Sequence, residues 1–307
     1  MNCRHCKTTL EHIFLDLGYA PPSNAYLNKT DLNQPEVYFP LKVKVCNKCW
    51  LVQTEDYADA KMLFKPEYEY FSSTSQSWLL HSKNYFDKII KKLNIDKNSY
   101  VIEVASNDGY LLKNFTKKNI TFLGIEPTIN TANAAEKLNI PVLKKFFGKT
   151  LAKELAEEGK QADLIIGNNV YAHVPDINDF TDGIKLLLKP GGTITLEFPH
   201  LLRLIENIQF DTIYHEHFSY LSLHVVSRIF SNSNLRIFLV EEISTHGGSL
   251  RVYGCHQNDK RKTDPSVTKL LERESNRGLL KLETYMNFTD RVNKIKDNLL
   301  KFLLEQK

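Results

Sequence analysis

Residues 100–109, Tyr-Val-Ile-Glu-Val-Ala-Ser-Asn-Asp-Gly, constrain the fold more than any other part of this sequence. The stretch begins as an apolar, β-branched run that suits a strand buried on both faces. It ends in small and polar residues that tolerate a sharp turn close to a ligand. Apolar residues at helical spacing follow in 110–115, so the turn should lead from a first strand into a first helix. Open α/β sheets bind their ligands at this edge, which makes the turn a candidate binding site.

The next segment, 121–126, is predicted to be a second strand that ends in the carboxylate of Glu126. An acid at that position can bind both ribose hydroxyls of an adenosine, which suits a dinucleotide and S-adenosylmethionine equally. A pyrophosphate requires a glycine-rich turn, whereas this turn has one glycine, Gly109, and two acids, Glu103 and Asp108. The acids suit the cationic sulfonium and amino group of S-adenosylmethionine. The alternative is an ordinary strand-to-helix turn with a capping Asn or Asp.

Length and composition exclude several classes of protein. The 307 residues exceed one typical domain, and the apolar and charged fractions of 42% and 25% are those of a soluble globular protein. A net charge of +4 without an arginine-rich stripe argues against nucleic acid as a partner. No apolar run approaches the roughly 18 residues that span a bilayer, and the chain starts with a cysteine pair rather than a signal peptide. We therefore expect a cytoplasmic protein that does not bind membranes.

Four of the five cysteines lie in two C-x-x-C pairs, which are Cys3, Cys6, Cys46 and Cys49. Each pair can present two thiolates to one tetrahedral Zn²⁺, and a structural zinc site has all four positions closed by protein ligands. The 39 residues between the pairs are irregular and proline-containing, so metal binding would supply folding energy there. The alternatives are four unconnected thiols, or a ligand set that includes His5 or His12.

Strand-like and helical segments alternate from a helix over 78–93 to a strand over 193–198. This alternation predicts an α/β fold with a largely parallel, doubly wound sheet. Two more strand-like runs lie at 235–240 and 247–253, and residues 266–307 are charged and helical in pattern. We expect a small N-terminal zinc-binding domain over residues 1–62, an α/β domain with a tyrosine lid loop over residues 63–257, and a helical C-terminal segment over residues 258–307.

Two polar segments should lie near the binding edge of this sheet. Residues 63–77 are rich in aromatic and hydroxyl side chains and could cover the site, with Tyr68 or Tyr70 pointing a phenol inward. The alternative is that these tyrosines pack a linker onto the domain. Residues 168–175 follow a predicted strand and should share the sheet edge of the glycine turn, which places His173 on the cofactor side.

Residues 211–220, Asp-Thr-Ile-Tyr-His-Glu-His-Phe-Ser-Tyr, form the densest cluster of titratable and hydroxyl groups in the chain. Two histidines here, His215 and His217, lack the H-E-x-x-H spacing of a helical zinc site. We interpret the cluster as an acid–base site, because a histidine near its unperturbed pKa of about 6.5 needs only a carboxylate partner to become a base. The alternative is a hydrated surface loop.

These motifs occur in a fixed order: the cysteine pairs, Tyr-Phe-Ser-Ser-Thr-Ser (70–75), Glu-Val-Ala-Ser-Asn-Asp-Gly (103–109), Asn-Asn-Val-Tyr-Ala-His-Val-Pro-Asp (168–176), Tyr-His-Glu-His-Phe-Ser-Tyr (214–220) and Gly-Gly-Ser-Leu-Arg-Val (247–252). Over nearly all of its length the chain thus closely resembles the sugar C-methyltransferases, zinc-containing and S-adenosylmethionine-dependent enzymes that methylate a ring carbon of nucleotide-linked deoxysugars. The resemblance implies a zinc-binding domain, a Rossmann-like class I methyltransferase domain and a C-terminal Rossmann-like domain that helps to hold the nucleotide sugar. The sequence stops where that last domain should begin, so we expect that domain to be separately encoded, lost or truncated.

The resemblance also implies a reaction, namely methylation of the carbon next to the ketone of a dTDP-linked 4-keto-deoxysugar through an enolate. The catalytic residues that it implies are His217 as the base, Glu216 as a group that orients or assists it, Tyr214 with Tyr68 or Tyr70 as hydrogen-bond partners of the sugar or its enolate, and His173 as a second-rank contact. The alternatives are an O- or N-methyltransferase for another small molecule, and a non-catalytic remnant that lacks the nucleotide-sugar domain.

For the cofactor, S-adenosylmethionine, the expected contacts lie along the predicted sheet edge. They are Glu126 for the ribose, Glu103, Ala105, Asn107 and Gly109 around the methionine portion, Phe146 and Phe147 beside the adenine, and Asn168 at the floor. The four cysteines are expected to bind a structural Zn²⁺ that takes no part in the chemistry.

Overall fold

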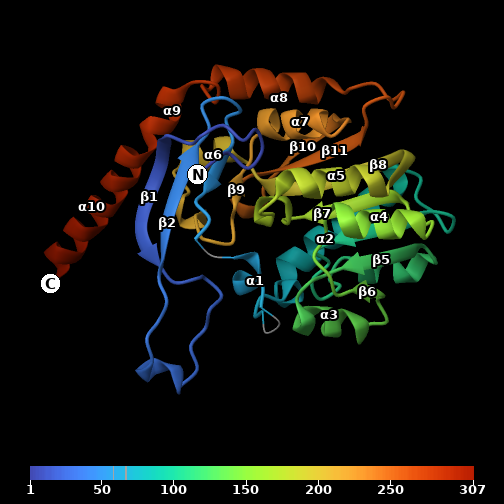
Figure 1. Cartoon of the computed structure of the whole chain (residues 1–307), viewed down its shortest axis with the longest axis horizontal. Helices are drawn as coiled ribbons and strands as arrows, with labels where there is room; N and C mark the ends of the chain where they lie inside the picture. Colours follow the sequence, from blue (N-terminus) through green and yellow to red (C-terminus); the bar gives the residue numbers. More distant parts are fainter. Residues whose placement is uncertain (58, 66–67) are drawn as a thin grey trace.

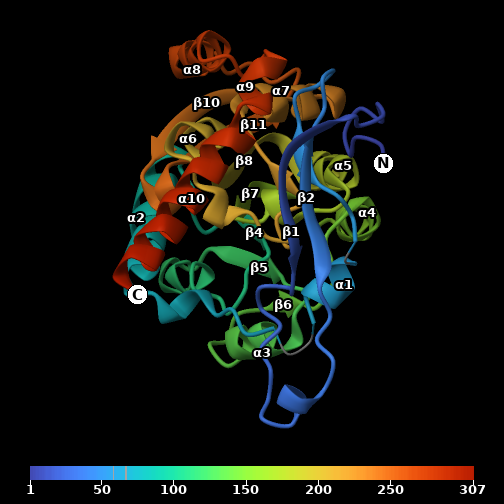
Figure 2. The ribbon, with the colours of Figure 1, turned by 90° about the vertical axis from the view of Figure 1, so that its left-hand side faces the viewer.

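The computed structural model describes residues 1–57, 59–65 and 68–307. A large sheet forms the centre of the α/β part, with helices on both of its faces (Figure 1, Figure 2). In sheet order its strands are β10 (Leu235–Ile243), β11 (Ser249–His256), β8 (Leu188–Pro199), β7 (Ala162–Asn168), β4 (Tyr100–Val104), β5 (Thr121–Ile125) and β6 (Val142–Leu143). The strands from β8 to β6 are parallel, whereas β11 and β10 run antiparallel to their neighbours. The predicted α/β fold with a largely parallel sheet is confirmed.

The apolar run of β4 is continuous because both faces of the sheet are covered. Val101 lies in one hydrophobic cluster with residues of α2 (Gln76–Lys92), and Ile102 lies in another with residues of α4 (Lys149–Glu157) and α5 (Ile177–Leu187). Successive side chains of a strand point to opposite faces, so each of these residues serves a different core. α3 (Ile129–Glu136) packs with the first cluster, and α7 (Leu223–Asn232) packs with the second.

The segment after the turn differs from the prediction. Residues 110–115 do not form an α-helix; the structure has two short 3₁₀ helices, Leu112–Asn114 and Thr116–Lys118, which are followed by Asn119 in the left-handed conformation. Tyr110, Leu111 and Leu112 are all buried. Three consecutive buried side chains cannot share one face of an α-helix, whose turn takes 3.6 residues.

The N-terminal part forms a second, smaller sheet whose order is β1 (His12–Ala20), β2 (Phe39–Val45), β3 (Val52–Thr54) and β9 (Ser219–Tyr220), with α1 (Ala60–Leu63) after β3. Its last strand, β9, comes from much later in the sequence than the other three. Its core also includes residues of α6 (Leu201–Asn207), α9 (Leu282–Met286) and α10 (Phe288–Gln306). The chain between β1 and β2 extends away from the body as a long loop, with a short 3₁₀ helix, Asp31–Asn33, in it (Figure 1).

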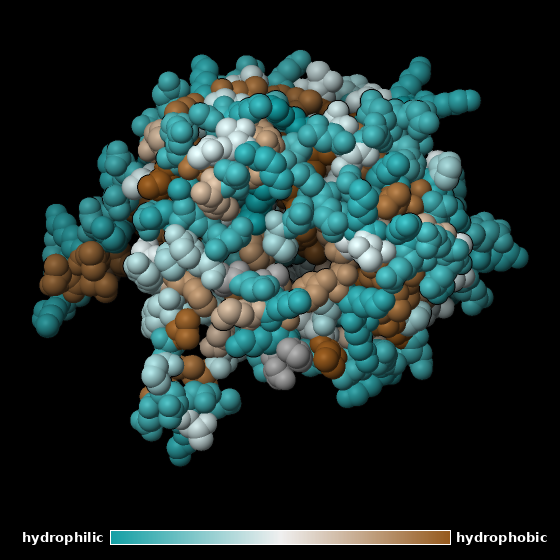
Figure 3. Space-filling model, viewed as in Figure 1, coloured by the Kyte–Doolittle hydropathy of each residue, from teal (hydrophilic) through white to brown (hydrophobic). Residues whose placement is uncertain are grey.

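The helical C-terminal prediction is confirmed by α8 (Pro265–Asn276), α9 and α10. The last turns of α10 project beyond the body, where Leu299, Phe302 and Leu303 are exposed and form an apolar patch on an otherwise mostly hydrophilic face (Figure 3). Within the described residues, no helix is both long enough and apolar enough to cross a membrane.

Candidate functional site

A cavity of about 480 Å³ opens where the carboxyl ends of the central strands meet the tyrosine loop, the start of the β1–β2 loop and residues 211–217. Ala105 and Asn107 follow β4, Glu126 follows β5, and Asn168 ends β7. Because the chain leaves β4 toward β5 on one side and reaches β7 on the other, this is the topological switch point at which open α/β sheets bind ligands.

The cavity brings together side chains from segments that are far apart in sequence. The predicted site residues that line it are Tyr68, Tyr70, Ala105, Asn107, Glu126, Phe146, Phe147, Asn168, His173, Tyr214, Glu216 and His217. Glu103 and Gly109 are not among the lining residues. Pro66 and Glu67, in the tyrosine loop, lie outside the described residues.

The structure shows why residue 109 is a glycine, a reason that the sequence did not reveal. Its φ is +77°, and a Cβ built there would lie 2.3 Å from Cδ1 of Ile140 and 3.2 Å from Cβ of Ala135. The glycine therefore allows the turn to pack against α3 and the segment after it. Its close approach is to protein and not to the cavity.

Glu103 is fully buried beneath the turn, and neither of its carboxylate oxygens has a hydrogen-bond partner within the described part of the chain. Burial raises the pKa of this carboxyl well above its usual range, and the negative charges of Glu126 and Asp108 raise it further. A buried carboxyl without a partner is costly, and a cationic group of a ligand beside it would reduce that cost.

Glu126 is held in one orientation at the cavity wall. Its Oε2 accepts a hydrogen bond from the backbone N–H of Asn107 (2.9 Å), and its Oε1 accepts from the N–H of Thr128 (2.9 Å). Burial raises the pKa of this carboxyl, although the hydrogen bonds from Thr128 and Asn107 oppose that shift. Each carboxylate oxygen has two lone pairs, so Oε2 can still accept from a ribose hydroxyl.

Other polar atoms at this edge have no partner within the described residues. Both amide atoms of Asn168 and the hydroxyl of Ser106 are buried and unpaired. Phe146 is exposed, while Phe147 is partly buried and packs edge-on against Phe180 at 5.2 Å. Orphaned hydrogen-bonding groups beside apolar rings fit an amphipathic ligand such as S-adenosylmethionine, which carries polar groups at both ends and a flat adenine.

The tyrosine loop is tied directly to the turn after β4. Asn107 Oδ1 accepts a hydrogen bond from the N–H of Ser72 (2.9 Å), and Asn107 Nδ2 donates to the carbonyl of Tyr70 (3.0 Å). Asp108 Oδ2 accepts from the N–H of Ser73 (3.0 Å). The side chains of Asn107 and Asp108 thus hold the cover of the cavity in place, a role that the sequence did not indicate.

His217 has a defined tautomer. Its Nδ1 lies 2.9 Å from the carbonyl oxygen of Thr212, which can only accept, so Nδ1 carries the proton. Its Nε2 lies 2.8 Å from the hydroxyl of Tyr214. Burial lowers the pKa of His217 well below 6.5, and the ring of His173 at 4.6 Å adds repulsion between charges. Burial raises the pKa of Tyr214. At neutral pH a protonated phenol therefore donates to a neutral imidazole.

Glu216 is not the group that orients His217. Its carboxylate oxygens accept from Tyr68 Oη (3.0 Å), from Ser23 Oγ (3.0 Å) and from Asn24 Nδ2 (2.8 and 3.0 Å). Burial and the Glu216 charge raise the pKa of Tyr68, so this phenol also remains a donor. The orienting role belongs to the Thr212 carbonyl. Ser23 and Asn24 were missed because no local pattern in the β1–β2 loop marks them.

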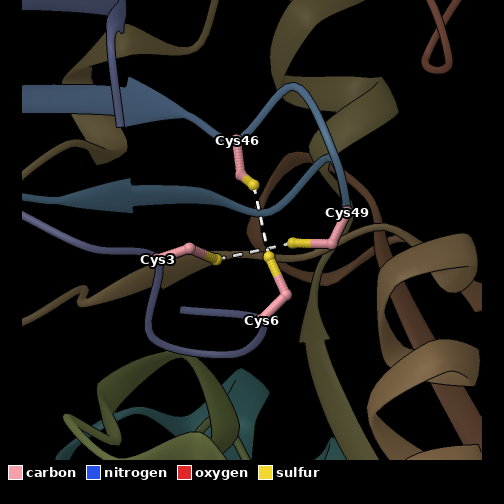
Figure 4. A group of neighbouring side chains, drawn as sticks. All are labelled: Cys3, Cys6, Cys46 and Cys49. Carbon is pink, nitrogen blue, oxygen red and sulfur yellow. Dashed lines mark hydrogen bonds between the residues drawn. The ribbon is translucent and has the colours of Figure 1, made fainter. Parts of the chain in front are cut away.

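The four cysteines converge as predicted, with sulfur atoms directed toward one another (Figure 4). Cys3 Sγ and Cys49 Sγ lie 3.4 Å apart, Cys6 Sγ and Cys46 Sγ lie 3.5 Å apart, and all four sulfurs lie within 4.8 Å of one another. A tetrahedral Zn²⁺ with bonds of about 2.3 Å separates its sulfur ligands by about 3.8 Å, which this cluster matches. His5 contacts Asn178 and Asn232 instead and is not part of the cluster.

A buried arginine joins this cluster to the cavity. Arg4 lies between Cys3 and Cys6 and donates from Nε to the carbonyl of Phe218 (3.1 Å) and from Nη1 to the carbonyl of Pro175 (2.9 Å). Phe218 directly follows His217, and Pro175 ends the segment that carries His173. The cysteine knuckle therefore supports both segments that carry the histidines of the cavity.

Comparisons with known proteins agree with this geometry. Residues 3–64 match the family model of a zinc-binding domain, residues 78–240 match that of a methyltransferase domain, and residues 244–307 match that of a C-methyltransferase C-terminal domain. The methyltransferase model alone covers more than half of the chain.

Individual relatives extend the comparison. The C-methyltransferase NovU of Streptomyces niveus is 31% identical over 294 residues, which are 96% of this chain and 70% of that protein. The ubiquinone biosynthesis O-methyltransferase of Bartonella tribocorum is 27% identical over 104 residues, 31% of this chain and 39% of that protein. Among solved structures, the PH0226 protein of Pyrococcus horikoshii is similar in fold, with a TM-score of 0.50, 14% identity, and coverage of 61% of this chain and 94% of that one. The chain therefore belongs to the family of zinc-binding, S-adenosylmethionine-dependent C-methyltransferases.

Proposed function

We propose that this enzyme methylates the ring carbon next to the ketone of a dTDP-linked keto-deoxysugar. The observation that carries the proposal is the chain of hydrogen bonds from Tyr214 through His217 to Thr212, which lies in the wall of the same cavity as Glu126. A buried, neutral imidazole beside the cofactor edge of the sheet supports the assignment of His217 as the base. The motifs shared with the sugar C-methyltransferases support the choice of substrate.

Carbon methylation requires a base of this kind. A proton on a carbon next to a ketone is acidic because its anion delocalises onto the carbonyl oxygen as an enolate. His217 is kept neutral by burial and is held by Thr212, so its Nε2 can take up that proton once the phenol of Tyr214 makes way or relays it. A base that was already protonated at neutral pH could not take up this proton, either directly or through Tyr214.

The enolate oxygen needs hydrogen-bond donors, because charge develops there as the carbon loses its proton. Tyr68 and Tyr214 are both protonated phenols in the cavity wall, since burial raises their pKa values. Each has one hydroxyl hydrogen, which it would have to turn from its present acceptor, Glu216 or His217, to the enolate oxygen. Tyr70 is 51% exposed and lies at the rim, so we assign the donor role to Tyr68 within this pair. The two phenols approach from different segments and could hold the oxygen between them.

S-adenosylmethionine, when bound, supplies an electrophilic methyl group to the substrate carbon. The residues that would hold it are Glu126 at the ribose, Asn168 and the turn at the methionine portion, and Phe146 with Phe147 at the adenine. Glu103 lies beneath the turn and outside the cavity lining, so it would contribute negative charge only once a cationic group of the ligand lowers its pKa. The loop that Asn107 and Asp108 hold over the cavity limits the access of water.

The test begins with turnover. Purified protein is incubated with S-adenosylmethionine and a panel of dTDP-linked keto-deoxysugars, and products are identified by mass spectrometry and NMR. We expect a new methyl group on a ring carbon. A methyl group on oxygen or nitrogen would contradict the proposed reaction, and the absence of product from every sugar would contradict the proposed substrate class.

The base is tested with His217→Ala. A positioned base contributes about 10²–10⁴-fold, so turnover should fall in that range while S-adenosylhomocysteine still binds. In deuterated water with S-adenosylhomocysteine in place of the methyl donor, the wild-type protein should exchange the proton of the substrate carbon, and the variant should not. Equal exchange rates in both proteins would remove His217 from the role of base.

A further inference from the structure

The carboxylate of Glu216 is held largely by the N-terminal domain. Ser23 Oγ and Asn24 Nδ2 supply three of its four hydrogen bonds, and Tyr68 supplies the other. Ser23 and Asn24 lie at the start of the β1–β2 loop and line the cavity, more than 190 residues before Glu216 in the sequence. The cavity therefore has one wall that the α/β domain does not provide.

The hydrogen bonds are suited to a charged carboxylate. Glu216 is only 2% exposed, and the part of the chain that the structure describes contains no salt bridge to it. A buried carboxylate is stable only when neutral donors or a cation replace its water. Here the replacement consists of a hydroxyl, an amide and a phenol, which together occupy the acceptor positions of both oxygens.

The β1–β2 loop has little else to fix its position. Tyr26 and Leu32 in this loop are 73% and 67% exposed, so its apolar side chains do not anchor it. Among the described residues, the side-chain hydrogen bonds that join this loop to the α/β domain run through Ser23 and Asn24. The hydrogen bonds between these two residues and Glu216 thus fix the position of the loop at the cavity mouth, and they also fix the carboxylate.

We propose that Ser23 and Asn24 are positioning residues that fix Glu216, and through it the phenol of Tyr68, so that the zinc-binding domain completes the sugar half of the active site. The inference rests on the proposed function for its kinetic consequence. Its structural part, the coupling between the loop and Glu216, stands independently of the substrate.

The variants are Asn24→Ala, Asn24→Asp and Ser23→Ala. Asn28→Asp is the matched control, because Asn28 lies in the same loop but is exposed and does not line the cavity. With a dTDP-keto-sugar that the wild-type protein methylates, Asn24→Ala should lower kcat by about 10- to 100-fold, the range for lost hydrogen bonds to a charged group. The affinity for S-adenosylhomocysteine and the zinc content should not change. The control should behave like the wild-type protein.

Asn24→Asp supplies a readout that a purely structural role would not change. It places a second carboxylate against Glu216, near Tyr68 and Tyr70 of the tyrosine loop, Tyr214 and His217 of the segment that carries Glu216, and His173. Two adjacent carboxylates cannot both ionise easily, so one proton is shared between them at lower pH. Activity of this variant relative to Asn24→Ala should therefore rise as the pH falls from 8 to 6. A constant ratio across this range would overturn the proposed role.

Amide hydrogen exchange measures the coupling without substrate. Asn24→Ala and Glu216→Ala should each accelerate exchange in residues 21–30, and the double variant should show no further acceleration. Unchanged exchange in both single variants would overturn the inference even if the enzyme is active. If the wild-type protein methylates no sugar but the exchange results are as expected, the proposed substrate fails and the coupling stands.

Discussion

His173 and His217 are kept neutral by their surroundings. Burial lowers the pKa of His173 to about 4, and it lowers the pKa of His217 well below 6.5. Their rings lie 4.6 Å apart, so protonation of one disfavours protonation of the other. For His217 this means that the proposed base is ready to accept a proton at neutral pH.

The shift of His173 predicts a dependence of stability on pH. Between pH 6.5 and 4 the unfolded chain binds a proton at this histidine that the folded protein does not, so the free energy of unfolding falls as the pH falls. The loss is on the order of 1–3 kcal/mol. Urea denaturation of the wild-type protein and of His173→Asn at pH 7.5 and pH 5 should show a smaller loss for the variant, which cannot titrate there. An equal loss in both proteins would contradict the shift.

Glu126 should contribute directly to cofactor affinity. Glu126→Ala is expected to weaken binding of S-adenosylhomocysteine by about 1–3 kcal/mol, the cost of its lost hydrogen bonds, as measured by calorimetric titration. Because the carboxylate also holds the N–H groups of Asn107 and Thr128, Glu126→Gln, which keeps one acceptor oxygen, should lose less. Glu136→Ala on the exposed face of α3 is the matched control and should bind normally. Wild-type affinity in Glu126→Ala would rule out the ribose contact.

At the scale of elements, the turn after β4 is both a cavity wall and a packing surface. Asn107 and Asp108 hold the tyrosine loop on one side, while Gly109 contacts Ile140 and Ala135 on the other. The residues that the sequence marked as cofactor contacts therefore also determine where two neighbouring segments lie. A change in this turn should affect the stability of the α/β domain as well as binding.

A comparison of two glycines distinguishes the cost of backbone strain from the cost of steric overlap. Gly109 and Gly159 both have positive φ, +77° and +74°, but a Cβ at Gly159 would meet nothing within 4 Å. Gly159→Ala should cost about 1–2 kcal/mol of unfolding free energy from backbone strain alone. Gly109→Ala should cost roughly 1–3 kcal/mol more, because its Cβ would overlap Ile140. Chemical denaturation measures both, and equal losses would show that the packing around Gly109 yields easily.

At the scale of the whole molecule, the cysteine cluster and Arg4 connect the N-terminal segment to the α/β part of the chain. Hydrogen bonds from Cys46 and Cys49 lower the pKa of Cys3, whereas the same cluster raises the pKa of Cys49. Four thiolates within 4.8 Å of one another would repel strongly, so a bound cation is needed to keep all four ionised. Arg4, between two of the cysteines, hydrogen-bonds to the segments that contain His173 and His217, so the position of these segments depends on the cysteine cluster.

Cys46→Ser should remove zinc and loosen the first 60 residues. In isolated zinc-finger peptides such binding is worth about 10–16 kcal/mol, which is also folding free energy. Elemental analysis should find zinc in the wild-type protein and in Cys255→Ser, whose buried sulfur lies in the α/β core, but not in Cys46→Ser. The α/β domain of Cys46→Ser should still bind S-adenosylhomocysteine. Retained zinc, or a disulfide among these cysteines in freshly reduced protein, would contradict a structural Cys₄ site.

Local patterns in the sequence were sufficient for much of this protein. The β-branched run before Gly109, the alternation of strands and helices and the two C-x-x-C pairs predicted the sheet, its binding edge and the metal cluster. These features depend on the pattern of apolar residues and on the spacing of cysteines along the chain, both of which can be read from the sequence. The same reasoning failed for 110–115, because three buried residues in a row leave no single helical face.

The partners of the proposed catalytic side chains were decided only by tertiary structure. Ser23 and Asn24 meet Glu216, and Arg4 meets Phe218, across about 190 to 214 positions of sequence. The smaller sheet likewise takes β9 from the middle of the chain, and α9 and α10 cover it. Such contacts have no periodicity to reveal them, because they follow from how the finished sheets pack and from the need of each buried polar group for a partner.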